Sequence, residues 1–361
     1  MSFTEQLKQT AYELGFCLVG VCPAVSTPGY GRFREWLEKG YAGEMNYLPD
    51  RAEAYAHPRS ILEGVRSVLM LGMNYRTVPE AAAAAGEGKV AAYAWGSRDY
   101  HDLIRERLKA LRAFVEQRYP ESCNRGVVDT APLLERDYAQ LAGLGWMGKN
   151  TLLLNRHFGS WFFLAALLTD LDLAPDVPFE SDHCGSCTAC LDSCPTQAFP
   201  QPYVLDATRC ISYLTIELRG ETPTLLRDDV GDWLFGCDVC QTVCPWNHKS
   251  PSASEAAFSP TDDKYPVELR ALFGLTDEQF RARFRHTPLW RSKRQGILRN
   301  AAIVLGNQRA ESAVPALRIG LDDADAVVRD ACAWALSKID TRAARAALAA
   351  TREQPSSEEG A

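Results

Sequence analysis

Residues 184–195 read CGSCTACLDSCP, and residues 237–245 read CDVCQTVCP. The first run has the C-x2-C-x2-C-x3-C-P spacing of bacterial two-cluster ferredoxins, in which three close thiolates bind one cluster and the fourth binds the other. The second run lacks the first cysteine of that pattern, because Leu234 stands three residues before Cys237. Cys210 lies between the two runs and is the expected substitute. The pattern therefore predicts two [4Fe-4S] clusters.

Each predicted cluster takes four of these eight cysteines. The first set is Cys184, Cys187, Cys190 and Cys244, and the second set is Cys194, Cys210, Cys237 and Cys240. Zinc is a weaker interpretation, because zinc sites usually stop at four ligands in two pairs. Disulfides are weaker too, because they give no reason for a repeated CxxCxxxCP pattern. Clusters only carry electrons, so the catalytic centre is expected elsewhere in the chain.

The length and composition of the chain indicate a multi-domain globular protein. A chain of 361 residues is expected to form two or three domains. The opening sequence MSFTEQLKQTAYELGF is predicted to be an amphipathic helix and neither a signal peptide nor a twin-arginine leader. The apolar run at residues 161–168 is far too short for a membrane span. We therefore expect a cytoplasmic protein that spans no membrane, and a reducing compartment suits thiolate ligands.

Three domains are predicted from changes in sequence texture. Residues 1–175 combine short apolar stretches with helical patterns, which indicates a mixed α/β (α+β) domain. Strands are expected at residues 16–21, 67–72 and 161–169, helices at 98–117 and 133–143, and a mobile surface loop at 81–89. Residues 176–250 form the predicted ferredoxin-like domain with its two clusters. Residues 251–361 are predicted to combine a connector with an all-α domain.

An internal repeat characterises the predicted all-α domain. LRNAA at residues 298–302 aligns with VRDAC at residues 328–332, at a period of 30. Each copy is followed by a break and another apolar helix, as in HEAT-type repeats, and an ordinary helical cap is the alternative. Stacked helix pairs of this kind present extended surfaces to large partners. Residues 353–361 are expected to be a polar, frayed tail.

Asp129 is the first candidate for chemistry. It follows two β-branched residues in the stretch VVDTAPLLER, residues 127–136. A carboxyl group at a strand end that faces a cleft is partly desolvated, which raises its pKa and keeps it protonated as a general acid. The residue types alone favour a simpler role, in which Asp129 caps a helix that begins near Pro132.

The second candidate is the segment LAGLGWMGKNT, residues 141–151. Its three glycines allow close backbone approach, and the Lys-Asn-Thr triplet supplies hydrogen-bond donors, which suits an anionic or amide-rich cofactor. The spacing is one residue short of a P-loop, and no strand leads into the glycines as a dinucleotide fingerprint requires. A plain helix C-terminus followed by a turn is the alternative.

The third candidate is YAWGSRDYH, residues 93–101, which is dense in aromatic and hydrogen-bonding groups. Loops that line ligands often have this composition. His101 is interpreted as either a ligand or a partly exposed residue at a helix start. Arg51 and His57 have the same two interpretations.

A basic cluster is the fourth candidate, in a chain whose net charge is −7. No acidic residue interrupts it, and aromatic side chains lie within it. Such patches bind phosphate backbones, and aromatic side chains stack on bases, so nucleic-acid binding is predicted. A solvated helix face beside an acidic neighbour is the alternative. The cluster consists of Arg281, Arg283, Arg285, His286, Arg291, Lys293, Arg294 and Arg299, with Phe284 and Trp290 between them.

The order of these motifs resembles the epoxyqueuosine reductase family. VVDTAPLLER, AGLGWMGKNTLL, the two cysteine runs and the HEAT-like tail follow one another over nearly the whole chain. Members of this family are cobalamin-dependent iron–sulfur enzymes that remove the epoxide oxygen of epoxyqueuosine at the wobble position of tRNA, the last step of queuosine synthesis. The resemblance implies the same reaction here, with a base-off cobalamin, since no DxHxxG corrinoid motif is present. It also implies tRNA and an external low-potential electron donor as partners, and we expect a monomer.

The resemblance also implies roles for single residues. Asp129 matches the proton donor proposed for the family, so the resemblance favours the acid over the helix cap. Cobalamin is expected to be lined by Arg51, Asp99, Tyr100, His101, Asp129, Leu134, Glu135, Arg136, Gly145, Trp146, Met147, Lys149, Asn150 and Thr151. The tRNA is expected at Arg281, Arg283, Arg285, Trp290, Arg291, Lys293 and Arg294.

Two other functions are compatible with parts of the sequence. A corrinoid reductive dehalogenase would act on small organohalides, but it would normally carry a twin-arginine leader and lack the HEAT tail. A ferredoxin-like electron carrier with a scaffold domain would not need some 175 residues before its clusters.

Overall fold

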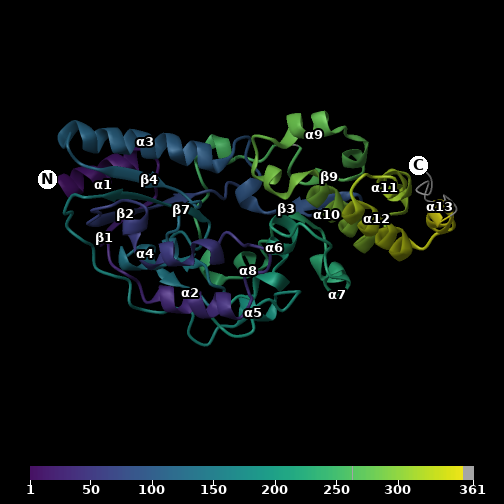
Figure 1. Cartoon of the computed structure of the whole chain (residues 1–361), viewed down its shortest axis with the longest axis horizontal. Coiled ribbons are helices and arrows are strands. Elements are labelled where there is room, and N and C mark those ends of the chain that lie inside the picture. Colours follow the sequence, from purple (N-terminus) through teal and green to yellow (C-terminus); the bar gives the residue numbers. More distant parts are fainter. Residues whose placement is uncertain (262, 353–361) are drawn as a thin grey trace, which may run out of the picture. The chain divides into compact units, whose positions relative to one another are not determined.

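The computed structural model describes residues 1–261 and 263–352, so the predicted tail at residues 353–361 lies outside the described residues. The chain forms two compact units, each assembled from separate stretches of sequence (Figure 1). Unit 1 comprises Met1–Pro79, Gly96–Thr208 and Asp238–Ser259, and unit 2 comprises Glu80–Trp95, Arg209–Cys237 and the described part of Pro260–Ala361. The domain borders predicted at residues 175 and 250 stay predictions.

Unit 1 is built on a four-stranded antiparallel sheet with the strand order β1-β2-β7-β4. The strands are β1 (Leu18–Pro23), β2 (Ser67–Asn74), β4 (Asn124–Val127) and β7 (Phe162–Thr169). The prediction of β1, β2 and β7 is confirmed to within a few residues. The strand β4 was missed because its sequence, Asn-Arg-Gly-Val, contains a single large apolar residue.

Helices cover both faces of this sheet (Figure 1). The helices α1 (Phe3–Glu13) and α3 (Tyr100–Arg118) contact each other and the strands on one face, and α4 (Glu135–Leu141) contacts the strands on the other. Alternate residues of a strand point to opposite faces. Met70 of β2 and Ala166 of β7 accordingly pack with Tyr138 of α4. Fully burying a side chain such as Met70 contributes roughly 1.5–3 kcal/mol.

The pairing of α3 with β4 positions the residue that follows the strand. Residues 119–123 connect the end of α3 to the start of β4, so the strand runs back along the helix. The close packing requires glycine, because a Cβ on Gly126 would lie 2.9 Å from the Cβ of Leu108. The end of β4 therefore lies beside the first turn of α3.

A hairpin follows α4 in unit 1. Its strands are β5 (Trp146–Met147) and β6 (Leu153–Leu154). The segment at residues 141–151 therefore starts with the end of α4, as the alternative expected, and continues into a hairpin. Gly145 permits the pairing, because a Cβ there would lie 2.0 Å from the carbonyl oxygen of Leu154. The remaining helices of unit 1 are α2 (Gly29–Glu38), α5 (Ala189–Asp192) and α8 (Val239–Thr242). The short helices α5 and α8 lie within the two cysteine runs and contact each other.

Unit 2 contains a second, smaller sheet with the strand order β8-β3-β9. Its strands are β3 (Glu87–Val90), β8 (Trp233–Phe235) and β9 (Val267–Glu268). The predicted loop at residues 81–89 is therefore wrong from Glu87 onward, because β3 is the central strand of this sheet. Three helices of the unit are α6 (Ile211–Ile216), α7 (Thr224–Arg227) and α9 (Asp277–Phe284).

The C-terminal helices of unit 2 stack as a HEAT repeat (Figure 1). They are α10 (Lys293–Asn307), α11 (Val314–Leu321), α12 (Ala326–Ile339) and α13 (Arg342–Arg352). The helix α12 contacts α10, α11 and α13. The aligned residues Leu298 and Val328 are both fully buried, on α10 and α12 respectively, which confirms the repeat that the sequence predicted. Among the residues described, no helix has the length and apolar character needed to cross a membrane.

Candidate active site and iron–sulfur site

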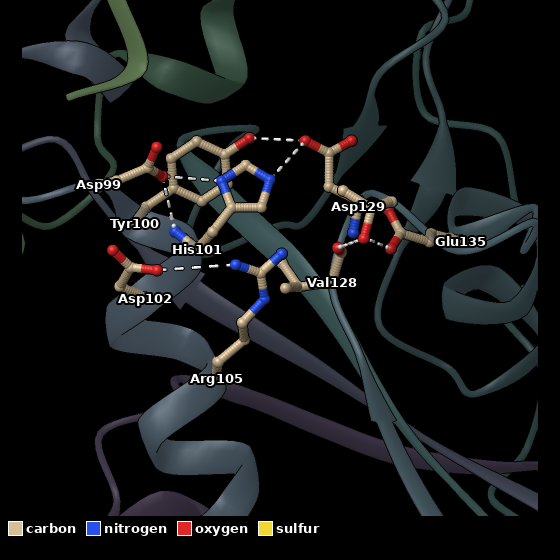
Figure 2. A network of polar contacts seen from close by, with 9 residues as sticks. Asp99, Tyr100, His101, Asp102, Arg105, Val128, Asp129 and Glu135 are labelled. Carbon is tan, nitrogen blue, oxygen red and sulfur yellow. Dashed lines mark hydrogen bonds and ion pairs between the residues drawn. The ribbon is translucent and has the colours of Figure 1, made fainter. Parts of the chain in front are cut away.

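Asp129 follows β4 by two residues and has a left-handed backbone conformation, with φ at 57°. This conformation is uncommon for residues other than glycine, although aspartate tolerates it better than most. The helix α4 begins at Glu135, and its N-cap is Leu134, so the interpretation of Asp129 as a helix cap is wrong. The Asp129 side chain is 54% exposed and points to the first turn of α3 (Figure 2).

Two side chains from α3 reach the Asp129 carboxyl group. The Tyr100 hydroxyl donates a hydrogen bond to Oδ2 over 2.7 Å, and Nε2 of His101 lies 3.1 Å from the same oxygen (Figure 2). Both residues are buried, and the Tyr100 ring stacks on Phe163 of β7 with the ring centroids 4.0 Å apart. The packing fixes both groups in positions from which they can exchange a proton with Asp129.

Asp99 fixes the orientation of His101. Asp99 is the N-cap of α3, and its Oδ1 accepts a hydrogen bond from the backbone N–H of His101 over 3.0 Å. The same oxygen lies 2.8 Å from Nδ1 of the imidazole (Figure 2). A carboxylate at Nδ1 favours a proton on that nitrogen and turns Nε2 towards Asp129. His101 is 3% exposed, so the expectation of a partly exposed residue is wrong.

Glu135 contacts the backbone of Asp129 rather than its side chain. Its Oε1 accepts a hydrogen bond from the Asp129 N–H over 2.9 Å (Figure 2). Burial, and then the nearby Asp129 carboxylate, raise the pKa of Glu135 to about 8. Glu135 is therefore a neutral acid at pH 7, which lowers the negative charge around Asp129.

Two arginines hold the backbone near the network. Nη1 of Arg51 lies 3.4 Å from the carbonyl oxygen of Thr130, and Arg136 donates a hydrogen bond to the carbonyl of Thr151, which has a positive φ. Arg51 also lines an open cavity of about 680 Å³, with charged side chains from residues 34–38 and 50–53. Small-molecule sites commonly have volumes of this size. The predicted residue Leu134 packs against the core on the α4 side of the sheet.

The first predicted set of cluster ligands lies entirely within unit 1. Burial, followed by the neighbouring thiols of Cys244, Cys184 and Cys187, raises the pKa of Cys190 to about 11. Cys190 thus lies near the other three thiols, and Cys184 packs against the group that contains Cys244. This arrangement fits a cluster in which each thiolate binds a different iron. Within the described residues, no group of three or more His, Cys, Asp or Glu could hold a single metal ion.

The hairpin predicted to line a cofactor reaches the cysteine runs. Nζ of Lys149 donates hydrogen bonds to the carbonyl oxygens of Gly185 and Cys187, over 2.6 and 2.9 Å. Nδ2 of Asn150 donates to the carbonyl oxygen of Cys240 over 3.3 Å. Trp146 packs between the cysteine runs, whereas Met147 is half-buried on β5. Sequence spacing gave no sign of these contacts, because Lys149 and Gly185 are 36 residues apart.

The second predicted set of ligands is divided between the units. Cys194 and Cys240 belong to unit 1, and Cys210 and Cys237 belong to unit 2. Cys210 is the N-cap residue of α6, and Cys237 follows β8 by two residues. The assignment of these four cysteines to one cluster stays a prediction.

The predicted tRNA residues of unit 2 differ in exposure. Arg281, Arg285 and Lys293 are exposed, and Nζ of Lys293 lies 5.0 Å from the centre of the Trp290 ring. The residues Arg283, Arg291 and Arg294 are half-buried. Arg294 forms ion pairs with Asp277, at 3.1 Å, and with Asp323, at 2.8 Å. Folding therefore neutralises part of a cluster that is purely basic in sequence.

Arg299 was wrongly included in the basic surface cluster. It is 1% exposed, and its guanidinium donates hydrogen bonds to the backbone carbonyls of Leu214, Leu218 and Gly220. A buried arginine satisfied by three carbonyls has a structural role and is not available to a phosphate. Its position in the repeated LRNAA motif indicated burial, since the neighbouring Leu298 faces the core.

Three family models match parts of the chain. The model "Epoxyqueuosine reductase QueG, DUF1730" matches residues 56–130, which include Asp99, His101 and Asp129. The model "4Fe-4S double cluster binding domain" matches residues 183–247, and "HEAT repeats" matches residues 289–359. The chain therefore contains a double-cluster [4Fe-4S] domain followed by HEAT repeats.

Several proteins that match nearly the whole chain are epoxyqueuosine reductases. The epoxyqueuosine reductase of Pseudomonas aeruginosa is 41% identical over 341 residues, which cover 92% of this chain and 94% of that protein. A crystal structure of an epoxyqueuosine reductase with an epoxyqueuosine-modified tRNA-Tyr stem loop has a TM-score of 0.90 at 31% identity, covering 98% of this chain and 94% of the other. The Bacillus subtilis enzyme, in a structure described as having its catalytic aspartate loop swung out of the active site, has a TM-score of 0.89 at 30% identity, covering 98% and 95%. From this similarity over nearly its full length, the chain belongs to the epoxyqueuosine reductase family.

Proposed function

We propose that the chain reduces epoxyqueuosine to queuosine at the wobble position of tRNA. The observation that carries this proposal is the placement of Asp129 against Tyr100 and His101 at the end of β4. An epoxide that opens under reduction develops negative charge on its oxygen, so a proton donor is needed at that atom. The epoxyqueuosine-modified tRNA stem loop bound by the solved relative supports the same substrate here.

The overall reaction balances with two electrons and two protons. They convert the epoxide to an alkene, and the epoxide oxygen leaves as water. The electrons come one at a time from an external low-potential donor through the clusters. Protonated Asp129 donates to the epoxide oxygen, and Tyr100 orients the carboxyl group. The imidazole of His101, held by Asp99, returns a proton to Asp129 for the next transfer.

Cobalamin is the cofactor that the family resemblance implies, and the residues present fit an amide-rich ligand of this kind. The Asp129 side chain is more than half exposed. A cavity of about 680 Å³, lined by both apolar and charged side chains, includes Arg51, and Nη1 of Arg51 lies 3.4 Å from the carbonyl oxygen of Thr130. When bound, cobalamin supplies a strongly reducing centre for cleavage of the carbon–oxygen bond. The residues proposed to hold it are Arg51, Asp99, Tyr100, His101, Asp129, Leu134, Glu135, Arg136, Gly145, Trp146, Met147, Lys149, Asn150 and Thr151.

The clusters are assigned by cysteine spacing, with support from the arrangement of thiols in unit 1. One cluster is bound by Cys184, Cys187, Cys190 and Cys244, whose mutual proximity supports the assignment. The other is bound by Cys194, Cys210, Cys237 and Cys240, on spacing alone. A reducing cytoplasm, where tRNA is modified, suits both sets of thiolates.

The tRNA surface is proposed on the exposed basic residues of unit 2. Arg281, Arg285 and Lys293 contact phosphates, and Trp290 supplies an aromatic ring beside them. The half-buried Arg283, Arg291 and Arg294 belong to the same proposed surface, where Arg283 is paired with Asp263 and Arg294 with Asp277 and Asp323. An anticodon loop presents the wobble base unpaired, so no duplex has to be melted. The chain is proposed to act as a monomer.

Mass analysis of tRNA tests the proposed function. A strain that lacks this gene is expected to accumulate tRNA nucleosides one oxygen heavier than queuosine. Expression of the wild-type chain restores queuosine, whereas a chain with Asp129→Asn does not. Normal queuosine in the deletion strain would contradict the proposal.

A further inference from the structure

Trp146 has a buried polar atom without a hydrogen-bond partner. The residue is 1% exposed, and its indole Nε1 has no partner among the described residues. An unpaired buried donor costs about 1–3 kcal/mol. The side chain belongs to a packed group with Leu154 and Cys244, and Cys184 packs against that group. The side chain that carries this donor therefore packs in one group with two of the four cysteines assigned to the first cluster.

Aromatic rings enclose the other sides of Trp146. Phe179 stacks on it with the ring centroids 5.5 Å apart, and His183 and Trp246 meet it edge-on at 4.9 and 5.0 Å. The indole N–H of Trp246 donates to the carbonyl oxygen of His183 over 3.3 Å, so that neighbouring indole is satisfied. The same packed group contains Cys184 and Cys244, which supply the sulfur atoms nearest to Trp146 in that group.

Lys149 places a positive charge on the same cysteine run. Its Nζ is anchored to the carbonyl oxygens of Gly185 and Cys187, inside the loop that carries the first two ligands. Lys149 and Trp146 come from one hairpin, three residues apart. The hairpin thus brings a cation and a hydrogen-bond donor to one cluster site.

We propose that Trp146 and Lys149 set the reduction potential of the cluster bound by Cys184, Cys187, Cys190 and Cys244. The indole N–H donates a hydrogen bond to a sulfur atom of that cluster, and the ammonium group offsets its charge. A [4Fe-4S] cluster gains one electron, and hence one negative charge, when the external donor reduces it. Hydrogen bonds and cations stabilise the more negative form and raise the potential. The proposal rests on the cluster part of the proposed function and is independent of the substrate.

Redox titration of the full-length holoprotein, followed by EPR of the reduced clusters, tests the proposal. Trp146→Phe keeps an aromatic ring and removes the donor. We expect the ratio of reduced to oxidised cluster at a fixed potential to fall about tenfold, which is a shift of 59 mV for a one-electron couple. Lys149→Met is also expected to lower the cluster potential, whereas Lys149→Arg keeps the positive charge and should leave the potential close to that of the wild type.

Trp161 provides a matched control for the tryptophan substitution. Its buried Nε1 also has no hydrogen-bond partner within the described residues, but its ring packs against Tyr75 and lies under Arg76. Trp161→Phe removes a comparable indole N–H from the ring beside Tyr75 and Arg76, so the potential of the cluster bound by Cys184, Cys187, Cys190 and Cys244 should not change. An equal shift in both variants would mean that the effect is general loosening and would overturn the proposal.

Pulsed EPR gives a second measurement that does not depend on the size of the shift. With ¹⁵N-labelled tryptophan, the reduced cluster should show a nitrogen coupling that disappears in Trp146→Phe. Full iron content with an unchanged cluster potential and no nitrogen coupling would overturn the proposal. The N–H of Trp146 would then face the ring of Trp246 instead of a sulfur atom of the cluster. Fewer than about eight irons in the wild type would overturn the cluster assignment itself. Normal clusters without epoxyqueuosine reduction would overturn only the substrate.

Discussion

The imidazole Nε2 of His101 lies 3.1 Å from Oδ2 of Asp129, while Asp99 holds the opposite ring nitrogen at 2.8 Å. A proton between His101 and Asp129 therefore belongs to the pair, and either residue can carry it. Asp129 must be protonated to act as an acid, and the imidazole is the group that can restore that proton. In the proposed mechanism, the hydrogen-bonded network, rather than a single carboxyl group, supplies the proton.

Asp129→Asn should abolish turnover while leaving the cofactors bound. Asparagine has nearly the same shape but cannot donate an acidic proton, so we expect a loss of about 10²–10⁴-fold in single-turnover rate on modified tRNA. Asp102→Asn is the control, because Asp102 is exposed on α3 and pairs with Arg105 (Figure 2). Full activity of the Asp129 variant would remove the residue from the mechanism.

Asp99→Asn should shift the pH dependence of kcat. Asparagine is as good an N-cap as aspartate, so the stability of α3 should be preserved. The loss of the carboxylate at Nδ1 makes the imidazolium of His101 less stable. The pH–rate profile is therefore expected to move to lower pH, with a lower kcat and little change in KM. A purely structural role would leave the profile in place.

Glu135→Gln should flatten the dependence of stability on pH. The folded chain keeps the Glu135 proton up to about pH 8, whereas the ordinary value is 4.5. Its stabilising contribution is thus complete below pH 4.5 and is lost as the pH rises through 8. Between pH 6.5 and 9 the free energy of unfolding of the wild type should fall by about 2 kcal/mol more than that of the variant. Anaerobic denaturant titrations at both pH values measure the difference, and parallel losses would contradict the assignment.

Reversing the exposed basic residues should weaken tRNA binding. We expect the combination of Arg281→Glu, Arg285→Glu and Lys293→Glu to raise the Kd for an anticodon stem loop about tenfold or more, and to reduce its salt dependence. Arg318→Glu is the control, because Arg318 is exposed on α11 outside the cluster. Binding assays at several salt concentrations compare the triple variant with the Arg318→Glu control. Cobalamin absorbance checks that each variant is intact. Unchanged affinity would place the tRNA on another surface.

Cys244→Ser should remove one cluster. The wild type is expected to contain about eight irons per chain, and the variant about four, because one ligand of the first set is lost. Cys123→Ser is the control, since Cys123 is exposed and belongs to neither set. Iron analysis of anaerobically purified protein measures both. Equal iron in the two variants would show that Cys244 is not a ligand.

Features encoded by local spacing could be read from the sequence. The cysteine runs predicted the double-cluster domain, and the 30-residue period predicted the stacked helices α10 and α12. The central strands β2 and β7 were visible because both faces are buried, so their sequences are continuous apolar runs.

Features produced by contacts between distant segments could not be read in the same way. Tyr100 and Asp129 are 29 residues apart, and they meet because α3 and β4 pack as an antiparallel pair. Local propensity favoured a helix cap at Asp129, and the tertiary contacts of α3 overrode it. Charge was misleading for the same reason, since Arg299 is basic in sequence but lies among backbone carbonyls in the fold.

The burial of Arg299 limits how the C-terminal helices can be exchanged. Together with Ser292 and Asn300, Arg299 donates hydrogen bonds to backbone carbonyls of residues 214–220 and 234. These carbonyls lose their donors if α10 is removed. The HEAT helices are thus not a module that can be grafted alone onto another reductase. A chimaera with new substrate preference would have to import residues 211–237 together with α10, and would therefore inherit Cys237, one of the four cysteines of the second predicted cluster.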